Sequence, residues 1–191
     1  EYWGWPNGVA VSTQVSKQAD VPMLLWLHAD RYDDSVKRAN HDYYELRCSH
    51  NSSLSHSAFG MVAADVGEAE VAYRHFRGTS MVDLLNTNHP VVGGTFIGGI
   101  HTAACGGTLQ LAVEGMGGLG FADGRLTIDP ALPGAWTSIT YPVRWRGNRL
   151  TVTVTHDDVT IEAAASNADT VPVVVRNSEI AVSPSDAVVL A

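Results

Sequence analysis

The chain has 191 residues, enough for one ordinary domain or two small ones, and its 45% hydrophobic and 17% charged content is typical of a folded globular protein. A formal charge of −8 without a Lys or Arg cluster argues against nucleic acid or an anionic membrane as a partner, because phosphate groups require concentrated positive charge. No apolar run approaches the roughly 20 residues that cross a bilayer. The two cysteines fit no metal-ligand spacing and predict a reduced, cytoplasmic protein.

The first part of the chain has apolar residues at helical spacing. Gly67 suits the end of one helix and Glu68 the acidic first turn of the next, which predicts a helical hairpin. The run 89–99 predicts a loop, because each of its glycines would cost a helix about 1 kcal/mol. Helices are expected at residues 18–28, 35–44, 55–66, 68–85 and 102–115.

After Gly115 the pattern changes to alternation with period two, which is typical of strands. A flexible exit is expected at Gly117, Gly118 and Gly120. Hairpin turns are expected at 146–149 and 156–158. The Val/Thr alternation gives each strand one buried face and predicts an antiparallel sheet or half-sandwich. Strands are expected at residues 126–128, 139–145, 150–155 and 159–162, with further strands at 171–175 and 180–190.

Three polar segments precede predicted helices. Lys17 and Gln18 supply ammonium and amide groups that suit sugar hydroxyls, although they also suit a solvated helix N-terminus. The serine-rich stretch 49–55 suits a phosphate, because hydroxyls and free backbone N–H groups meet at a helix N-terminus. Capping by Ser53 or Ser55 is expected there as well.

The third segment is a glycine-rich stretch that contains His101, which can donate to an anion or serve packing alone. His50 is a further site candidate within the serine stretch. The other histidines show no pairing with cysteine or carboxylate in the sequence, so no metal site is predicted.

Taken together, Val15–Val21, Tyr43–Ser55 and Gly99–Thr108 resemble glycoside hydrolase family 65, which contains the maltose, trehalose and kojibiose phosphorylases and the acid trehalases. The resemblance implies the C-terminal helices of an (α/α)6 barrel in residues 1–120 and a small β domain in residues 121–191. The family's general-acid segment is absent. The chain is therefore expected to be inactive alone and to need a companion chain with the upstream barrel, or a homo-oligomer.

The resemblance also implies an inverting α-glucoside phosphorylase, which cleaves an α-linked glucose disaccharide with inorganic phosphate and needs no other cofactor. Lys17 and Gln18 would hold the glucosyl unit. The phosphate contacts would be Ser52, Ser53, His101 and Thr102.

Two alternatives remain open, an inverting hydrolase of the same fold and a non-catalytic sugar-binding or assembly module. A hydrolase needs a base about 6.5 to 9.5 Å from the acid to activate water. Asn51 stands where many relatives carry an acidic residue, and an amide cannot take a proton. Glu45 is the remaining candidate base, but phosphorylase relatives share its Tyr-Tyr-Glu context, which implies a substrate contact.

Overall fold

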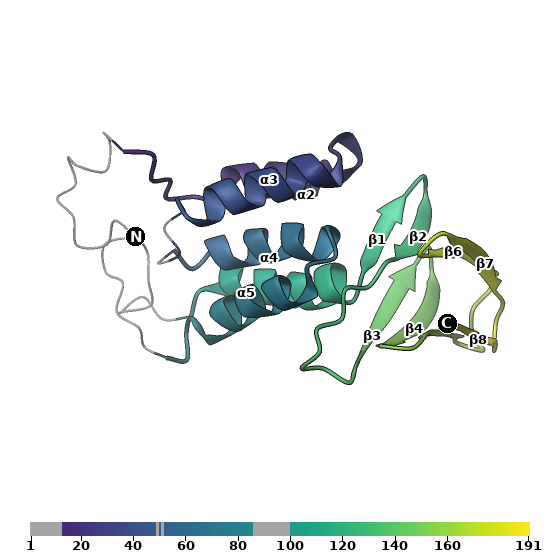
Figure 1. Cartoon of the computed structure of the whole chain (residues 1–191). Helices are drawn as coiled ribbons and strands as arrows, with labels where there is room; N and C mark the ends of the chain where they lie inside the picture. The colour runs from purple at the N-terminus through teal and green to yellow at the C-terminus, as the bar shows by residue number, and fades with distance from the viewer. Residues whose placement is uncertain (1–12, 49, 51, 86–99) are drawn as a thin grey trace. The chain divides into compact units, whose positions relative to one another are not determined.

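The computed structural model describes residues 13–48, 50, 52–85 and 100–191, and the chain divides into two compact units, residues 1–115 and 116–191. The first unit is helical and the second consists of strands (Figure 1). The predicted order of helices followed by a β region is confirmed. The loop predicted at 89–99 and the amide of Asn51 lie outside the described residues. Within the described ranges, no helix is long and apolar enough to cross a membrane.

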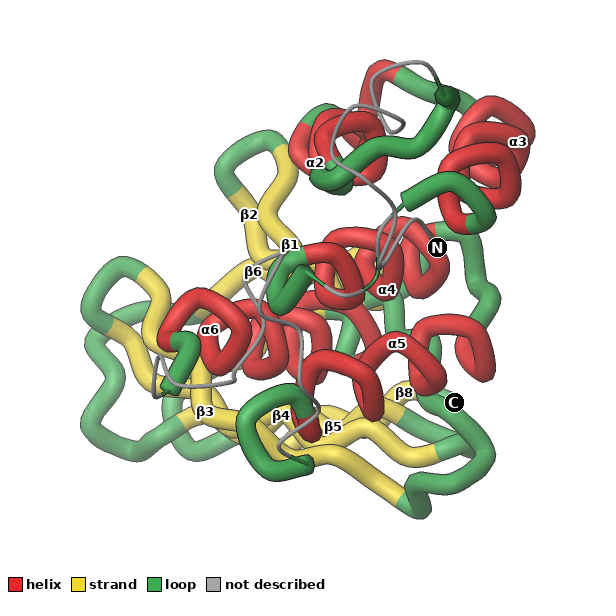
Figure 2. The backbone as a smooth tube through the Cα atoms, turned by 90° about the vertical axis from the view of Figure 1, so that its left-hand side faces the viewer, coloured by secondary structure: helices red, strands yellow, loops and turns green. Residues whose placement is uncertain are grey.

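The helices of the first unit are drawn in red in Figure 2. Most of them have shorter ends than predicted, whereas α3 is one residue longer at each end. The helix expected at 68–85 begins at Ala69 and ends at Met81. A π-helical turn over Leu111–Met116 continues the last helix. The elements are α2 (Asp20–Leu27), a 3-10 turn (Ala29–Arg31), α3 (Asp34–Glu45), α4 (Ser55–Asp65), α5 (Ala69–Met81) and α6 (Thr102–Gln110).

Helix α4 forms the core of this unit, because every residue from Ala58 to Ala64 is buried and α2, α3, α5 and α6 all contact it. The spacing of its apolar residues predicted a single buried stripe, but the helix is covered all round. Gly60 permits this packing, since a Cβ there would lie 2.4 Å from Leu111 Cδ2.

The turn between α4 and α5 confirms the predicted helical hairpin. Gly67 adopts φ +78°, a conformation that glycine reaches without strain. The Gly67 N–H donates to the Ala64 carbonyl at 2.9 Å, and the Glu68 N–H donates to the Ala63 carbonyl at 2.8 Å. These bonds satisfy carbonyl groups that the end of a helix leaves free.

The second unit contains two four-stranded sheets, in the orders β1-β2-β6-β7 and β3-β4-β5-β8. Along β4, β5 and β6 every second side chain is buried, as the Val/Thr alternation predicted. The strands are β1 (Leu119–Ala122), β2 (Arg125–Ile128), β3 (Ser138–Trp145), β4 (Asn148–Thr155), β5 (Val159–Ala163), β6 (Val171–Val175), β7 (Ser178–Val182) and β8 (Ala187–Leu190).

The expected flexible exit is wrong in part, because Gly120 lies in β1 opposite Thr127. The turn between β1 and β2 consists of Asp123 at φ 50° and Gly124 at φ 74°. Asp-Gly is the favoured pair for a two-residue hairpin turn, since both positions require positive φ. The Asp123-Gly124 dipeptide is therefore a sequence signal for this hairpin, which was not among the predicted turns.

Strands expected within 180–190 are present as β7 and β8, which belong to different sheets. The expected antiparallel pairing needs one correction. Strand β2 pairs with β6 in parallel, with Leu126 opposite Val173. Alternation specifies which face of a strand is buried but leaves its partner and direction open.

Candidate functional site

Lys17 and Gln18 are exposed and lie just before α2. Their segment is attached to the chain that leads into the serine stretch. Ser16 forms a parallel bridge with Cys48, and its N–H donates to the Arg47 carbonyl at 3.0 Å. The structure thus brings the first two sequence motifs together, although about thirty residues separate them in the chain.

Cys48 anchors this contact as a packing residue. Its side chain is buried with Ala19, Ala58 and Phe59. Burial raises the pKa of the Cys48 thiol to about 11, so the thiol stays protonated and unreactive near neutral pH. Cys105 is exposed, and both cysteines are free thiols.

Ser52 and Ser53 are both buried before the first turn of α4. The Leu54 N–H donates to Ser52 Oγ at 3.4 Å, and Ser55 Oγ donates to the Ser52 carbonyl at 3.3 Å. Leu54 occupies the N-cap position and no side-chain bond caps the helix, so the predicted capping by Ser53 or Ser55 is wrong. Because Ser52 Oγ only accepts in the Leu54 bond, its own proton can still be donated.

His101 lies immediately before α6, and the exposed Thr102 is the first residue of that helix. Asp83 binds His101 twice: Oδ1 lies 2.8 Å from Nδ1, and Oδ2 accepts the backbone N–H at 2.8 Å. Burial raises the pKa of Asp83, but the hydrogen bonds from His101 outweigh it and the net shift is downward. The carboxylate therefore accepts from Nδ1–H, which leaves Nε2 as the nitrogen that can face a ligand.

The first turn of α4 packs against both α5 and α6. A Cβ on Gly78 of α5 would lie 2.7 Å from His56, and a Cβ on Gly107 of α6 would lie 2.6 Å from Ser57. Glycine at both positions lets the three helices approach closely. Within the predicted helix 102–115, Gly107 thus serves helix packing.

Glu45 is the last residue of α3 and is held by a cation that the sequence did not reveal. Its Oε1 lies 2.6 Å from Arg74 Nη2 and 3.2 Å from His75 Nε2. His41 Nδ1 lies 4.0 Å from Oε2. The expectation that these histidines lack a carboxylate partner is therefore wrong. The ion pair with Arg74 occupies the Oε1 atom of this carboxylate.

Two protein-family models match this chain. The family model for the glycosyl hydrolase family 65 central catalytic domain matches residues 4–110, and the model for the family's C-terminal domain matches residues 119–182. The chain belongs to glycosyl hydrolase family 65. The resemblance of the three motifs is thereby confirmed.

The relatives named here are α-glucoside phosphorylases. The 1,2-alpha-glucosylglycerol phosphorylase of Bacillus selenitireducens is 49% identical over 161 residues, which is 84% of this chain and 21% of that protein. The kojibiose phosphorylase of Caldanaerobacter subterraneus is 40% identical over 182 residues, which is 93% of this chain and 23% of that protein. The chain thus spans about a fifth of the length of these relatives.

A solved structure has the same fold over the whole chain. A human microbiome protein assigned as a kojibiose phosphorylase superposes with a TM-score of 0.84 at 26% identity, and the match covers 100% of this chain and 27% of that one. Within the family, the helical unit thus corresponds to the central catalytic domain and the strands to the C-terminal domain.

Proposed function

We propose that this chain provides the glucose- and phosphate-binding part of an inverting α-glucoside phosphorylase, with its helical unit forming the last helices of an (α/α)6 barrel. The observation that carries the proposal is the bridge between Ser16 and Cys48, because it attaches the Lys17–Gln18 segment to the serine stretch. The names of the relatives support phosphorolysis as the reaction class.

In the proposed reaction, Lys17 and Gln18 hold the glucosyl unit through its hydroxyls. Phosphate attacks the anomeric carbon, and the bond to the leaving sugar breaks while a proton donor from outside these 191 residues protonates it. Inversion of the α linkage yields β-glucose 1-phosphate. Phosphate is a co-substrate here and no other cofactor takes part. The free thiols of both cysteines suit the cytoplasm that we propose as its location.

The phosphate contacts in this proposal are Ser52, Ser53, Thr102 and His101. Asp83 is the positioning residue for His101, since it holds the Nδ1 proton and leaves Nε2 for the anion. A protonated Nε2 donates a charge-assisted hydrogen bond to phosphate, which is stronger than a bond between neutral groups. The start of α6 adds backbone N–H groups and the positive end of the helix dipole.

Hydrolysis is the less favoured reaction because Glu45, the remaining candidate base, is bonded to Arg74 at 2.6 Å. In a phosphorylase the nucleophile is an anion already, so no base is required. We assign Glu45 to the support of the surrounding helices and of the bound sugar.

The test uses the enzyme that contains this chain, with kojibiose, nigerose, trehalose and 1,2-α-glucosylglycerol as separate substrates. We expect β-glucose 1-phosphate from at least one of them only when phosphate is present. Equal release of free glucose in phosphate-free buffer would overturn the proposal in favour of hydrolysis.

Replacement of His101 or Ser53 by Ala tests the phosphate site itself. Loss of a hydrogen bond to a charged group costs about 1.5 to 3 kcal/mol, so the KM for phosphate should rise roughly ten- to a hundredfold. The KM for the disaccharide should change little. Ser138→Ala, on the exposed side of β3, is the matched control. An equal rise of both KM values would show that these residues do not form the phosphate site.

A further inference from the structure

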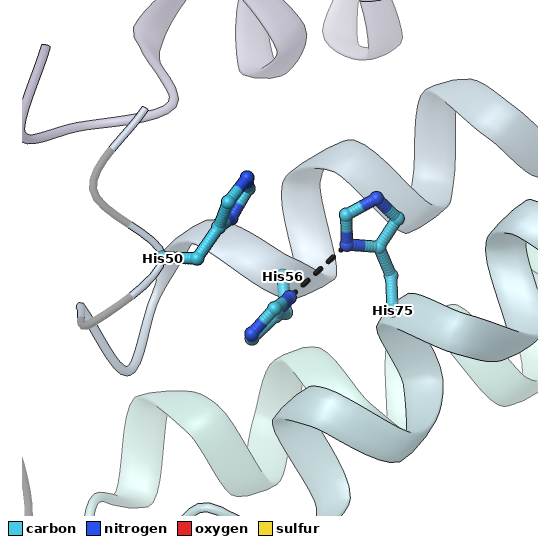
Figure 3. Close-up of side chains that lie close together, drawn as sticks. All are labelled: His50, His56 and His75. Carbon is cyan, nitrogen blue, oxygen red and sulfur yellow. Dashed lines mark hydrogen bonds between the residues drawn. The ribbon is translucent and has the colours of Figure 1, made fainter. Parts of the chain in front are cut away.

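Three histidines gather at the first turn of α4, and the proposed phosphorolysis uses none of them. His50 lies in the serine stretch, His56 in α4 and His75 in α5 (Figure 3). Each offers a ring nitrogen, and the three nitrogens lie within 4.8 Å of one another. The Nδ1 atoms of His56 and His75 are 3.1 Å apart. Three imidazoles at such distances form a possible set of metal ligands.

The hydrogen bonds around the cluster determine which nitrogens carry lone pairs. His50 Nε2 lies 3.0 Å from the Glu45 carbonyl oxygen, which can only accept, so the proton of His50 lies on Nε2. His50 Nδ1 then has a lone pair, and Ser55 Oγ lies 3.2 Å from it. A backbone carbonyl that holds the second ring nitrogen of a histidine is a common outer-shell partner in metal sites.

In His75 too, the ring nitrogen that points away from the other two histidines lies beside an oxygen atom of Glu45. Its Nε2 faces Glu45 Oε1 at 3.2 Å, is fully buried, and has no correctly directed hydrogen bond. A proton on Nε2 is attracted by this carboxylate, which leaves the lone pair on Nδ1. The Nδ1 atom of His75 faces His56, another histidine of the cluster. Carboxylate, histidine and metal in this order form a well-known supporting arrangement.

We propose that His50, His56 and His75 bind a divalent transition metal ion of the Zn²⁺ type. In a tetrahedral site with Zn–N bonds of about 2.0 to 2.1 Å, two ligand nitrogens are about 3.3 Å apart. The 3.1 Å between the Nδ1 atoms of His56 and His75 agrees with this spacing. Ligands that are all imidazole favour Zn²⁺, Ni²⁺ or Cu²⁺ over Mg²⁺ and Ca²⁺, which prefer oxygen.

A second group, His41, Glu45 and His75, also places three ligand atoms within 4.8 Å of one another. Arg74 Nη2 lies 2.6 Å from Glu45 Oε1, so a cation already occupies the direction from which a metal would bind this carboxylate. Glu45 is therefore the outer-shell partner, and the ion belongs on the side of His50 and His56. Bound there, it would join the serine stretch to α4 and α5.

The test titrates the tag-free, metal-stripped 191-residue chain with Zn²⁺ by calorimetry. We expect a single site per chain, and no comparable binding of Mg²⁺. Loss of an outer-shell partner alone costs about 10- to 100-fold in affinity, so His56→Gln and His75→Gln should each weaken Zn²⁺ binding by more than about 100-fold. His28→Gln, at an exposed position in the same unit, is the matched control and should bind as the unchanged chain does.

Two further measurements keep the result clear if a buried variant fails to fold. His50→Gln changes a half-buried position, and it should retain the helical circular dichroism signal while Zn²⁺ affinity falls. Co²⁺ absorption should show tetrahedral nitrogen ligation. The proposal is overturned if the unchanged chain does not bind Zn²⁺, if His50→Gln and His28→Gln bind equally well, or if Co²⁺ shows a thiolate band from cysteine.

Discussion

Acid should destabilise the helical unit through His56 and His75. In the unfolded chain a histidine has a pKa of about 6.5, whereas burial lowers the pKa of these two to about 4 and about 2 in the folded state. Below about pH 6.5 the unfolded chain therefore binds protons that the folded chain does not. Their contribution to stability is present above the unfolded pKa. It is lost as pH falls, through about pH 4 for His56 and further for His75.

The size of the effect follows from the pKa values. Each histidine can change the free energy of unfolding by at most about 1.4 kcal/mol per pH unit. Between about pH 7 and about pH 5 this amounts to roughly 2 kcal/mol for each ring. The two rings share one hydrogen bond at 3.1 Å, and His56 is partly exposed. For both rings together, the free energy of unfolding should therefore fall by about 2 to 4 kcal/mol over this pH range. Such a loss is large beside a typical stability of about 5 to 15 kcal/mol.

The assay is urea unfolding of metal-stripped protein, followed by helical circular dichroism at a series of pH values from about 7 to about 5. The double variant His56→Gln/His75→Gln should lose most of the pH dependence. His156→Gln, in the β unit, should keep it. The reasoning is refuted if the double variant and the unchanged chain lose stability at the same rate per pH unit.

Three further predictions concern packing in the two units. Gly118→Ala should destabilise the β unit by about 3 kcal/mol or more in thermal unfolding, because φ is +73° and a Cβ would lie 2.3 Å from a backbone carbon. Gly147→Ala, with φ +86° but open space, should cost only about 1 to 2 kcal/mol, and equal losses would contradict the steric explanation. Tyr141→Phe should lower the free energy of unfolding by about 1 to 2 kcal/mol, because the buried Gly117 carbonyl loses the hydrogen bond that the tyrosine hydroxyl donates at 2.8 Å. An unchanged midpoint in urea unfolding would refute this. Asp65→Asn should destabilise by about 1 to 3 kcal/mol, because the buried Lys37 ammonium loses the carboxylate 2.6 Å away and keeps only the exposed Asp34 at 3.7 Å. Lys37→Met should be nearly neutral, and the reverse order in chemical unfolding would contradict this account.

The sequence by itself determined the elements that depend on local pattern. Helical spacing located α3, α4 and α5 within a few residues, and Val/Thr alternation located the central strands, because side-chain direction follows the period of each element. Gly67 marked a helix end since its positive φ is a property of a single residue. The three motifs indicated the family, because their residues and order are readable along the chain.

The tertiary structure alone decided which distant residues meet. The pairs Asp83–His101 and Arg74–Glu45 and the histidine cluster around His75 join elements whose separation in the chain carries no periodic signal. Strand direction in the β2–β6 pair was equally open, since alternation is the same in parallel and antiparallel pairs. Local preferences specify helices, strands and turns one at a time. The contacts that give the site its charges and hydrogen bonds arise only when those elements pack, because packing selects one arrangement among many that the same local pattern allows.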